Sequence, residues 1–445
     1  MTETAENFCA EHIRSVLRYI DKFKNSIFVM YIDGAIFESN IYSQIIGDIC
    51  LMHQSGIQIV LVPGARAKID KTLCENNIPW EMHEGIRVTS ENTMPLIKMA
   101  AFDLPNAIMN MLARYKRTAL IGNWVRARSY GVRGGIDYGS AGCIDKINTD
   151  ALRTVLQNGF IPIFPCIGWS LSGKPYNISS MELAAEIAAQ LQADKLFFIS
   201  QSEIIPHEKP LAKKNAHCIS ALNIEQAQKL LVKMQAAKNK ESIAHNKHFL
   251  DTFSLALNAC KNGVERAHIL AGEAQEGTLL QEIFSDSGSG LMIYKNEYGG
   301  IRKMRLYDIP SVHALMQPFV QDGLLLERTP EDLAQNYKDY IVFELDGGVR
   351  ACAALHAYSD GQFEIAAVAV DKLFSELGTG PKMISFLVEK AKQFGAKSVF
   401  VLTSQTADWF ESLDFTKTDI ETLPSERKAV WDKKRTSKPY RITFE

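Results

Sequence analysis

Short apolar runs alternate with stretches of helical periodicity through the first part of the chain. Residues 27–32 and 57–63 are apolar runs of strand length, and a helical pattern follows each of them. Similar apolar runs occur at 118–121, 159–165, 195–200 and 268–270. Because neighbouring parallel strands need a crossover helix between them, this alternation predicts an α/β sandwich with a mostly parallel sheet. Glycine-rich segments at 130–142 and 168–176 predict hairpins that leave the sheet.

The order of elements changes after two glycine-containing segments, residues 285–290 and 298–300. Beyond them we predict a helix, three strands, a helix, a strand and a short helix, over 308–321, 340–345, 349–357, 362–370, 381–394, 398–403 and 406–413. Consecutive strands combined with segregated helices are typical of an α+β domain. The 445 residues therefore divide into two expected domains, residues 1–297 and residues 298–445.

The bulk composition excludes several classes of protein. Apolar residues make up 46% of the chain, and the formal net charge of −2 predicts no general attraction to nucleic acid. No run approaches the roughly 18 apolar residues of a membrane span, and the N-terminus lacks the pattern of a signal peptide. The eight cysteines are scattered singly, which argues against a metal site or a disulfide framework. We therefore expect a cytoplasmic protein with no permanently bound cofactor and no nucleic-acid or membrane partner.

A strand, a Gly-x-Gly turn and a helix follow one another in the C-terminal region. The strand covers 363–370, the turn reads Leu377-Gly-Thr-Gly-Pro381, and an apolar stripe marks the helix up to Gly395. Glycines let the backbone approach a phosphate, and the free N–H groups at a helix N-terminus favour its negative charge. The turn predicts a site for an anion, with an ordinary strand-to-helix turn as the alternative.

These elements, together with the strand at 398–403 and the aromatic segment 407–415, resemble the GNAT acetyltransferase superfamily. Its members bind the acetyl-CoA pyrophosphate at a Q/R-x-x-G-x-G/A loop, which here reads Ser375-Glu-Leu-Gly378-Thr-Gly380. The chain departs from the family at Ser375, and at Asp414, which stands where a glycine is usual. The resemblance implies acetyl-CoA as co-substrate, with contacts from Ala367, Val368, Val370, Gly378, Thr379 and Gly380.

Transfer of an acetyl group from a thioester to an amine needs a base that removes a proton from the ammonium group. Glu364 lies on the strand before the loop, where the GNAT family often keeps such a carboxylate. We therefore predict Glu364 as the catalytic residue, the alternative being an edge-strand glutamate that faces solvent. Cys352 has no paired base in the sequence, so we expect it in the core rather than as a nucleophile.

The N-terminal part resembles the amino-acid kinase family, in particular its acetylglutamate kinase branch. The resemblance rests on four segments: Phe28-Val-Met-Tyr-Ile-Asp-Gly34, Val62-Pro-Gly-Ala-Arg66, Gly85-Ile-Arg-Val-Thr89 and Asn177-Ile-Ser-Ser-Met181. Tyr31 replaces the family's phosphate-binding lysine, and Ala65 and Arg66 replace glycines of its second phosphate turn. Met181 replaces the aspartate that orients the family's catalytic lysines. A phenol cannot neutralise a phosphoryl group in transfer, so we expect a regulatory kinase fold without the kinase reaction.

An inactive acetylglutamate-kinase-like domain followed by a GNAT domain is the arrangement of the bacterial N-acetylglutamate synthase family. The resemblance implies synthesis of N-acetyl-L-glutamate and CoA from L-glutamate and acetyl-CoA, the first step of arginine biosynthesis. It makes Arg328, Arg435 and Ser437 candidates for binding glutamate, and arginine suits carboxylates because its donors form a fork. Two alternatives stay open: a GNAT enzyme for another amino acid or amine, and a non-catalytic arginine-sensing protein.

Arginine-sensitive members of this family bind L-arginine between an N-terminal helix and a loop of the kinase-like domain. Residues 8–24 have the spacing of an amphipathic helix. The resemblance implies an allosteric arginine site made by Tyr19, His268, Glu282, Gly288 and Gly290. It also implies that L-arginine inhibits the enzyme and that the N-terminal helices pair subunits into a homo-oligomer.

Overall fold

The computed structural model describes residues 16–17, 19–200, 220–236, 240–271, 279–280, 290–295, 300–345, 348–371, 379–431 and 437–444. The chain forms two compact units, Phe23–Glu297 and Tyr298–Glu445, and the N-terminal segment up to Lys22 groups with the second. The sequence had assigned this segment to a first domain of residues 1–297, and those domain limits stay a prediction.

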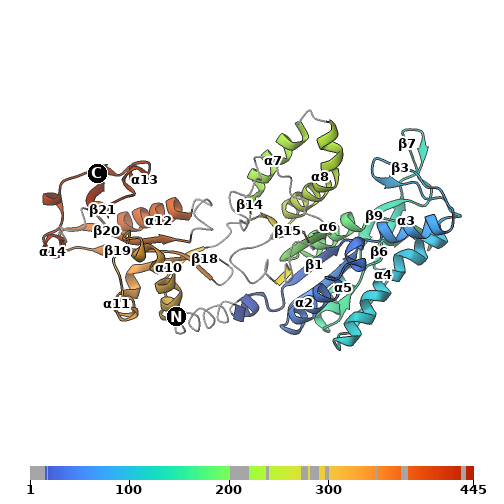
Figure 1. Ribbon diagram of the computed structural model, residues 1–445, viewed down its shortest axis with the longest axis horizontal. Coiled ribbons are helices and arrows are strands. Elements are labelled where there is room, and N and C mark those ends of the chain that lie inside the picture. The colour runs from blue at the N-terminus through green and yellow to red at the C-terminus, as the bar shows by residue number, and fades with distance from the viewer. Residues whose placement is uncertain are drawn as a thin grey trace. The chain divides into compact units, whose positions relative to one another are not determined.

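A six-stranded sheet forms the centre of the first unit, in the order β14-β16-β15-β13-β1-β2 (Figure 1). Its strands are β1 (Ile27–Ile32), β2 (Gln58–Pro63), β13 (Lys195–Ser200), β14 (Ser220–Asn223), β15 (Arg266–Ala271) and β16 (Leu291–Tyr294). All neighbours are parallel except β15 and β16. The predicted mostly parallel α/β sheet is therefore confirmed.

Helices cover both faces of this sheet, which is why β1 is buried along its whole length. Val29 and Tyr31 belong to a hydrophobic core shared with α6 (Ser180–Leu191) and α8 (Lys240–Lys261). Phe28 and Met30 are equally buried but lie outside that core. The helices are α2 (Tyr42–Gln54), α3 (Arg66–Glu75), α4 (Met94–Arg114), α5 (Thr149–Gln157), α6 (Ser180–Leu191), α7 (Ile224–Ala236) and α8 (Lys240–Lys261), with the 3-10 turn η1 (Gly34–Glu38).

Smaller sheets extend from the first unit at the glycine-rich segments. The predicted hairpins are present as β7 (Val132–Arg133) with β8 (Ile136–Asp137) and as β11 (Ile167–Trp169) with β12 (Pro175–Asn177). The remaining short strands are β3 (Met82–His83), β4 (Ile86–Arg87), β5 (Ala119–Leu120), β6 (Val125–Ser129), β9 (Gly142–Ile147) and β10 (Ile161–Pro162). The strands expected at 118–121 and 159–165 thus shrink to the two residues each that pair in β5 and β10.

The second unit has a seven-stranded sheet in the order β17-β18-β19-β20-β21-β23-β22. Its strands are β17 (Gly300–Lys303), β18 (Tyr340–Leu345), β19 (Gly348–Ala357), β20 (Gln362–Val370), β21 (Ser398–Thr403), β22 (Thr416–Lys417) and β23 (Lys438–Thr443). Its neighbours are antiparallel except β20 and β21. A mixed sheet with helices on both faces confirms the predicted α+β domain.

Alternate residues of β18 belong to the two cores of this unit. Ile341 and Phe343 pack in the core that contains α12 (Thr379–Gln393), and Tyr340 and Val342 in the core that contains α10 and α11. The other helical elements are α10 (Ile309–Gln321), α11 (Pro330–Asn336), α13 (Ala407–Glu411), α14 (Ser425–Ala429), η2 (Leu306–Asp308), η3 (Tyr337–Asp339) and η5 (Ile420–Thr422).

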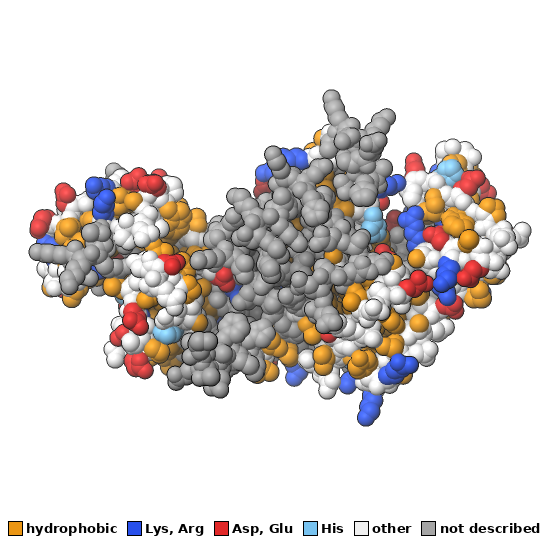
Figure 2. All heavy atoms as spheres, viewed as in Figure 1, with side chains coloured by type: hydrophobic (Ala, Val, Ile, Leu, Met, Phe, Trp, Pro, Cys, Tyr) orange, Lys and Arg blue, Asp and Glu red, His pale blue; other side chains and the backbone are white. Residues whose placement is uncertain are grey.

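Neither sign of charge dominates the face of the molecule drawn in Figure 2. On the face drawn in Figure 2, acidic and basic side chains of the described residues are intermixed. Among the helices that the structure describes, none has the length and apolarity needed to cross a bilayer.

Candidate functional site

A β-bulge interrupts β20 at the positions predicted to contact acetyl-CoA. The pairing of β20 with β19 slips by one residue between Cys352 and Ala354. Opposite this slip, Ala367 adopts a left-handed φ of 54°, a conformation that is uncommon for residues other than glycine. A bulge bends its strand and redirects the backbone, so it changes the direction of the peptide groups that follow.

The two central strands separate beside this bulge. β20 pairs with β21 only from Gln362 to Ile365. Beyond Ile365, residues 366–370 have no β21 partner among the described residues. Val368 and Val370 lie in this stretch and are half-buried against the α12 core. An extended ligand with amide groups can replace the missing strand partner, because backbone groups require hydrogen bonds.

The N-terminus of α12 lies close to the end of β20. Thr379 and Gly380 are its first residues and both are buried. A Cβ on Gly380 would lie 3.0 Å from the Trp409 ring and 3.8 Å from Val370, so the glycine permits this close packing. Gly378 and Ser375 lie outside the described residues. The described part of the turn therefore includes a helix N-terminus, whose free N–H groups favour a bound anion.

Glu364 is buried in β20, with only 6% of its surface exposed. Its Oε2 accepts hydrogen bonds from the Tyr358 hydroxyl at 2.7 Å and from Arg427 Nε at 2.9 Å. Among the described residues, no hydrogen bond reaches the other oxygen, Oε1. Since β20 is a central strand, the alternative of an edge-strand glutamate facing solvent is wrong. The two hydrogen bonds to Oε2 fix the position of the Glu364 side chain, and Oε1 has no partner among the described residues.

Sequence reasoning missed the contacts that Tyr358 and Arg427 make with Glu364. Tyr358 precedes the turn between β19 and β20, and its N–H donates to the Gln362 carbonyl. This hairpin register places it beside Glu364, so the short Ser-Asp-Gly turn was a usable signal. Arg427 is on α14, and no local pattern places α14 over β20. Burial and the neighbouring Glu364 carboxylate raise the pKa of Tyr358, so its hydroxyl remains a donor.

The predicted glutamate-binding residues are only partly located. Arg328 directly precedes Thr329, the N-cap of α11; it is half-buried, and its Nη1 donates to the Leu326 carbonyl at 3.3 Å. Ser437 directly precedes Lys438, which pairs with Thr403 at the end of β21 where the strands separate. Arg435 lies outside the described residues.

The other two predictions about single residues in this unit have clear structural outcomes. Cys352 is fully buried, and burial raises the pKa of its thiol to about 12, so it is inert core packing as expected. Asp414 adopts a left-handed φ of 66°, which explains the glycine usual at this position in the GNAT family. Aspartate tolerates this conformation better than most residues, so Phe415 still reaches the core, where it is 2% exposed.

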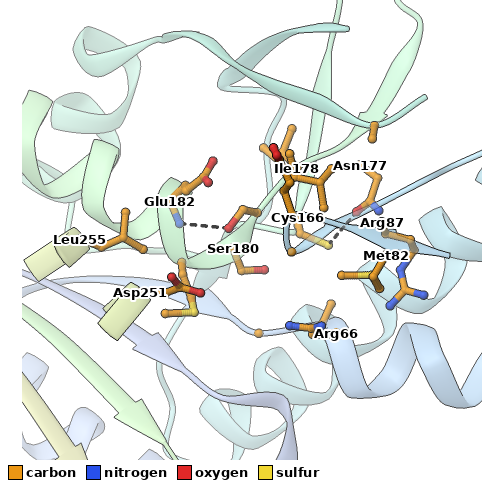
Figure 3. A pocket seen from close by; sticks show the side chains of 18 of the residues that line it. Arg66, Met82, Arg87, Cys166, Asn177, Ile178, Ser180, Glu182, Asp251 and Leu255 are labelled. Carbon is orange, nitrogen blue, oxygen red and sulfur yellow. Dashed lines mark hydrogen bonds between the residues drawn. The ribbon is translucent and has the colours of Figure 1, made fainter. Parts of the chain in front are cut away.

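The first unit contains a cavity of about 610 Å³ lined by the substituted kinase positions, partly drawn in Figure 3. Tyr31, Ala65, Arg66 and Met181 all line it. A Cβ on Gly64 would lie 2.6 Å from the Tyr31 hydroxyl, so the phenol closely packs against the glycine turn. Burial raises the pKa of Tyr31, which keeps the phenol neutral. The side chain that replaces the phosphate-binding lysine is therefore uncharged and fills space at this turn.

The predicted arginine-binding residues are partly described. His268 is buried in β15 and stacks on Phe197, with ring centroids 4.7 Å apart. Gly290 directly precedes β16, which pairs with β15, and a Cβ there would meet the Ile269 carbonyl at 2.5 Å. Tyr19 is helical and 3% exposed. Glu282 and Gly288 lie outside the described residues, so the assembled site stays a prediction.

Comparison with known proteins reveals similarity along the whole chain. Residues 26–271 match the amino acid kinase family. A protein of Pasteurella multocida (strain Pm70) named amino-acid acetyltransferase is 32% identical over 426 residues, 94% of each chain. The structure of N-acetylglutamate synthase from Neisseria gonorrhoeae, complexed with coenzyme A and L-arginine, covers 98% of this chain and 99% of its own, with 28% identity and a TM-score of 0.71. A structure of that enzyme with coenzyme A and N-acetyl-glutamate has 29% identity, the same coverage and a TM-score of 0.59.

Proposed function

Since the chain belongs to the amino-acid acetyltransferase family and is an acyltransferase, we propose that it transfers the acetyl group of acetyl-CoA to L-glutamate. The observation that carries this proposal is the placement of Glu364. This buried carboxylate lies on β20, whose residues beyond Ile365 have no β21 partner among the described residues, and one of its oxygens accepts no hydrogen bond from the described residues. The similar structure with coenzyme A and N-acetyl-glutamate bound supports both substrates.

The proposed reaction uses direct attack by the amine. Glu364 removes a proton from the ammonium group, directly or through a water, and the amine nitrogen then bonds to the thioester carbonyl carbon. The carbon–sulfur bond breaks, and the CoA thiolate takes up the second proton that the nitrogen loses as it becomes the amide, so CoA leaves as the thiol. The backbone of residues 366–370 would hold the pantetheine chain as an added strand, and the N-terminus of α12 would hold the pyrophosphate.

A substrate panel tests the proposed activity. The full chain is incubated with acetyl-CoA and each standard L-amino acid in turn, and release of free CoA is followed. We expect L-glutamate to give the highest kcat/KM, with N-acetyl-L-glutamate as the product. Comparable rates with several other amino acids or amines would favour the broader GNAT alternative. No release with any substrate would favour a non-catalytic sensing protein.

We also propose that L-arginine inhibits this reaction through the first unit. The similar structure with coenzyme A and L-arginine bound supports an arginine site in this family. A ligand that binds one arrangement of the protein better than another shifts the population towards it and alters a distant site. We further propose that the N-terminal helices of neighbouring copies pair subunits into a homo-oligomer, so that the effect of arginine can pass between chains.

Because acetyl-CoA and free glutamate are cytoplasmic metabolites, we propose that the enzyme works in that compartment.

Inhibition by arginine gives a direct prediction. Saturating L-arginine should lower the rate of CoA release with glutamate, and Glu282→Ala should remove this response while glutamate is still acetylated. A carboxylate at this position would pair with the guanidinium of the ligand. L-citrulline is the matched control, because it has the same backbone but no guanidinium charge. Equal rates with and without arginine would contradict the regulatory proposal and leave the acyltransferase assignment intact.

A further inference from the structure

Acetyl transfer to an amine leaves Glu364 protonated at the end of every turnover. The ammonium nitrogen loses two protons as it becomes an amide; Glu364 takes one of them, and the CoA thiolate takes the other. Glu364 must lose its proton before it can act on the next substrate molecule. Its side chain is only 8% exposed, and substrates bound over β20 would cover it further. A proton acceptor close to Glu364 would therefore speed the return of the carboxylate.

The two groups that form hydrogen bonds with Glu364 cannot take this proton. Tyr358 donates its hydroxyl to Oε2 at 2.7 Å, and Arg427 donates Nε–H to the same oxygen at 2.9 Å. A guanidinium group has no acceptor atom. Burial and the hydrogen bond to Glu364 raise the pKa of Tyr358, so the phenol stays protonated. The proton therefore has to leave Glu364 towards another group.

His356 lies directly opposite Glu364 in the sheet. Strands β19 and β20 are antiparallel, and His356 and Glu364 are partners in their register. The adjacent pair, Leu355 and Ile365, packs in the core that contains α12. Because side chains alternate along a strand, His356 and Glu364 share the other face. The Cβ atoms of directly opposite residues lie about 5 Å apart, so two side chains of this length can exchange a proton directly or over one water.

Asp339 orients the His356 ring. Asp339 is the last residue of η3, and its Oδ2 lies 2.9 Å from His356 Nδ1. An ionised carboxylate only accepts hydrogen bonds, so Nδ1 carries the proton of the neutral ring and Nε2 has the lone pair. The ring also packs edge-on against Tyr340, with ring centroids 6.4 Å apart. An aspartate that holds a histidine in this tautomer also stabilises the imidazolium that forms when Nε2 takes up a proton.

Solvent exposure increases from Glu364 outwards. The exposed fraction of the side chain is 8% for Glu364, 27% for His356 and 44% for Asp339. A proton that reaches the His356 ring has thus moved from a buried carboxylate to a group in contact with solvent. Water or a buffer base can remove it there.

We propose that His356, oriented by Asp339, relays the proton of Glu364 to solvent between turnovers. The proton moves from Glu364 to His356 Nε2, and the ring becomes an imidazolium paired with Asp339. Nε2 then releases the proton to water or to a buffer base. Glu364 returns to the carboxylate, and His356 returns to the neutral ring. This relay rests on the proposed acetyl transfer, but it does not depend on which amine accepts the acetyl group.

Comparison of the first turnover with later ones tests the relay. His356→Gln keeps a donor for Asp339 but cannot carry a proton. With the acceptor amino acid identified by the substrate panel, the first turnover should keep its rate, because Glu364 begins as a carboxylate. In dilute buffer the steady-state kcat should fall about 10-fold, less than the loss expected for the base itself. Rapid-quench measurements should therefore show a burst of about one acetylated product per active site.

A small base in solution should replace the missing ring. At constant ionic strength, added imidazole should restore most of the kcat of the His356→Gln chain and leave that of the unchanged chain as it is. Asp339→Asn still accepts from Nδ1 but lacks the charge that stabilises the imidazolium, so it should also lower kcat. His313→Gln is the matched control, because this half-buried histidine on α10 contacts Gln317 and forms no ion pair with a described residue. Its kcat should not change.

Two results would overturn the relay. One is an unchanged steady-state kcat of the His356→Gln chain in dilute buffer. The other is a slow first turnover that imidazole does not restore, which would mean that the substitution disturbs the sheet around Glu364. In both cases a slow first turnover in the Glu364→Gln chain would still support the acetyl transfer. Absence of any acetylated product from the unchanged chain would reject the acetyl transfer, and the relay with it.

Discussion

Glu364→Gln should lower the kcat for glutamate acetylation by about 10²-fold to 10⁴-fold, the usual contribution of a general base. Glutamine keeps the size of the side chain and can still accept hydrogen bonds from Tyr358 and Arg427, so the hairpin and α14 should stay in place. What is lost is the ability of the free oxygen to take a proton from the ammonium group. Steady-state kinetics with CoA release as the readout measure this effect.

Two further measurements separate a chemical effect from a structural one. The affinity for acetyl-CoA should change little, because the residues expected to hold it follow Glu364 on β20 and on α12. Glu421→Gln is the matched control, since this glutamate has a side-chain exposure of 91% in the same unit. Its activity should equal that of the unchanged chain. Normal turnover in the Glu364→Gln enzyme at neutral pH would exclude Glu364 from the reaction.

The second large effect concerns stability: Asp308→Ala should destabilise the second unit by about 3 kcal/mol, the lower end for breaking a buried ion pair. Asp308 is fully buried and accepts from Arg302 Nη1 and Nη2 at 2.7 and 2.8 Å, and from the Arg305 N–H at 2.7 Å. Alanine removes the acceptor of Arg302 Nη2 and of the Arg305 N–H, whereas Arg302 Nη1 keeps its hydrogen bond to the Lys303 carbonyl at 3.1 Å. Arg302 keeps its contact with Glu344 at 2.5 Å, which limits the loss.

Hydrogen exchange of backbone amides measures this loss within one unit, where a global unfolding curve would mix two units. Amides of β17 and β18 should exchange faster in the Asp308→Ala chain, whereas β1 and β13 should keep their protection. Glu389→Gln is the control, because Glu389 and Lys392 form an exposed pair on α12 and such pairs contribute little. Unchanged protection of β17 and β18 would show that this network does not stabilise the sheet.

Most of the regular structure follows from local patterns. The apolar runs at 27–32 and 195–200 became β1 and β13 with the predicted limits, because strands covered on both faces must be apolar throughout. The helix predicted over 381–394 begins earlier, at Thr379, since proline is well tolerated in the first turn of a helix. Substitutions such as Tyr31 and Met181 were also visible in the sequence, because each changes the chemistry of a known motif.

The sequence by itself determined the two fold classes, the family and the identity of Glu364 as the residue to examine. Only the tertiary structure decided what surrounds that residue. Arg427 reaches Glu364 across 63 positions of sequence, and such a contact depends on how α14 packs over the sheet. The bulge at Ala367 and the unpaired stretch beyond Ile365 depend on the pairing with neighbouring strands. The cavity of the first unit likewise arises from helices α3, α6 and α8, whose side chains meet only in the folded chain.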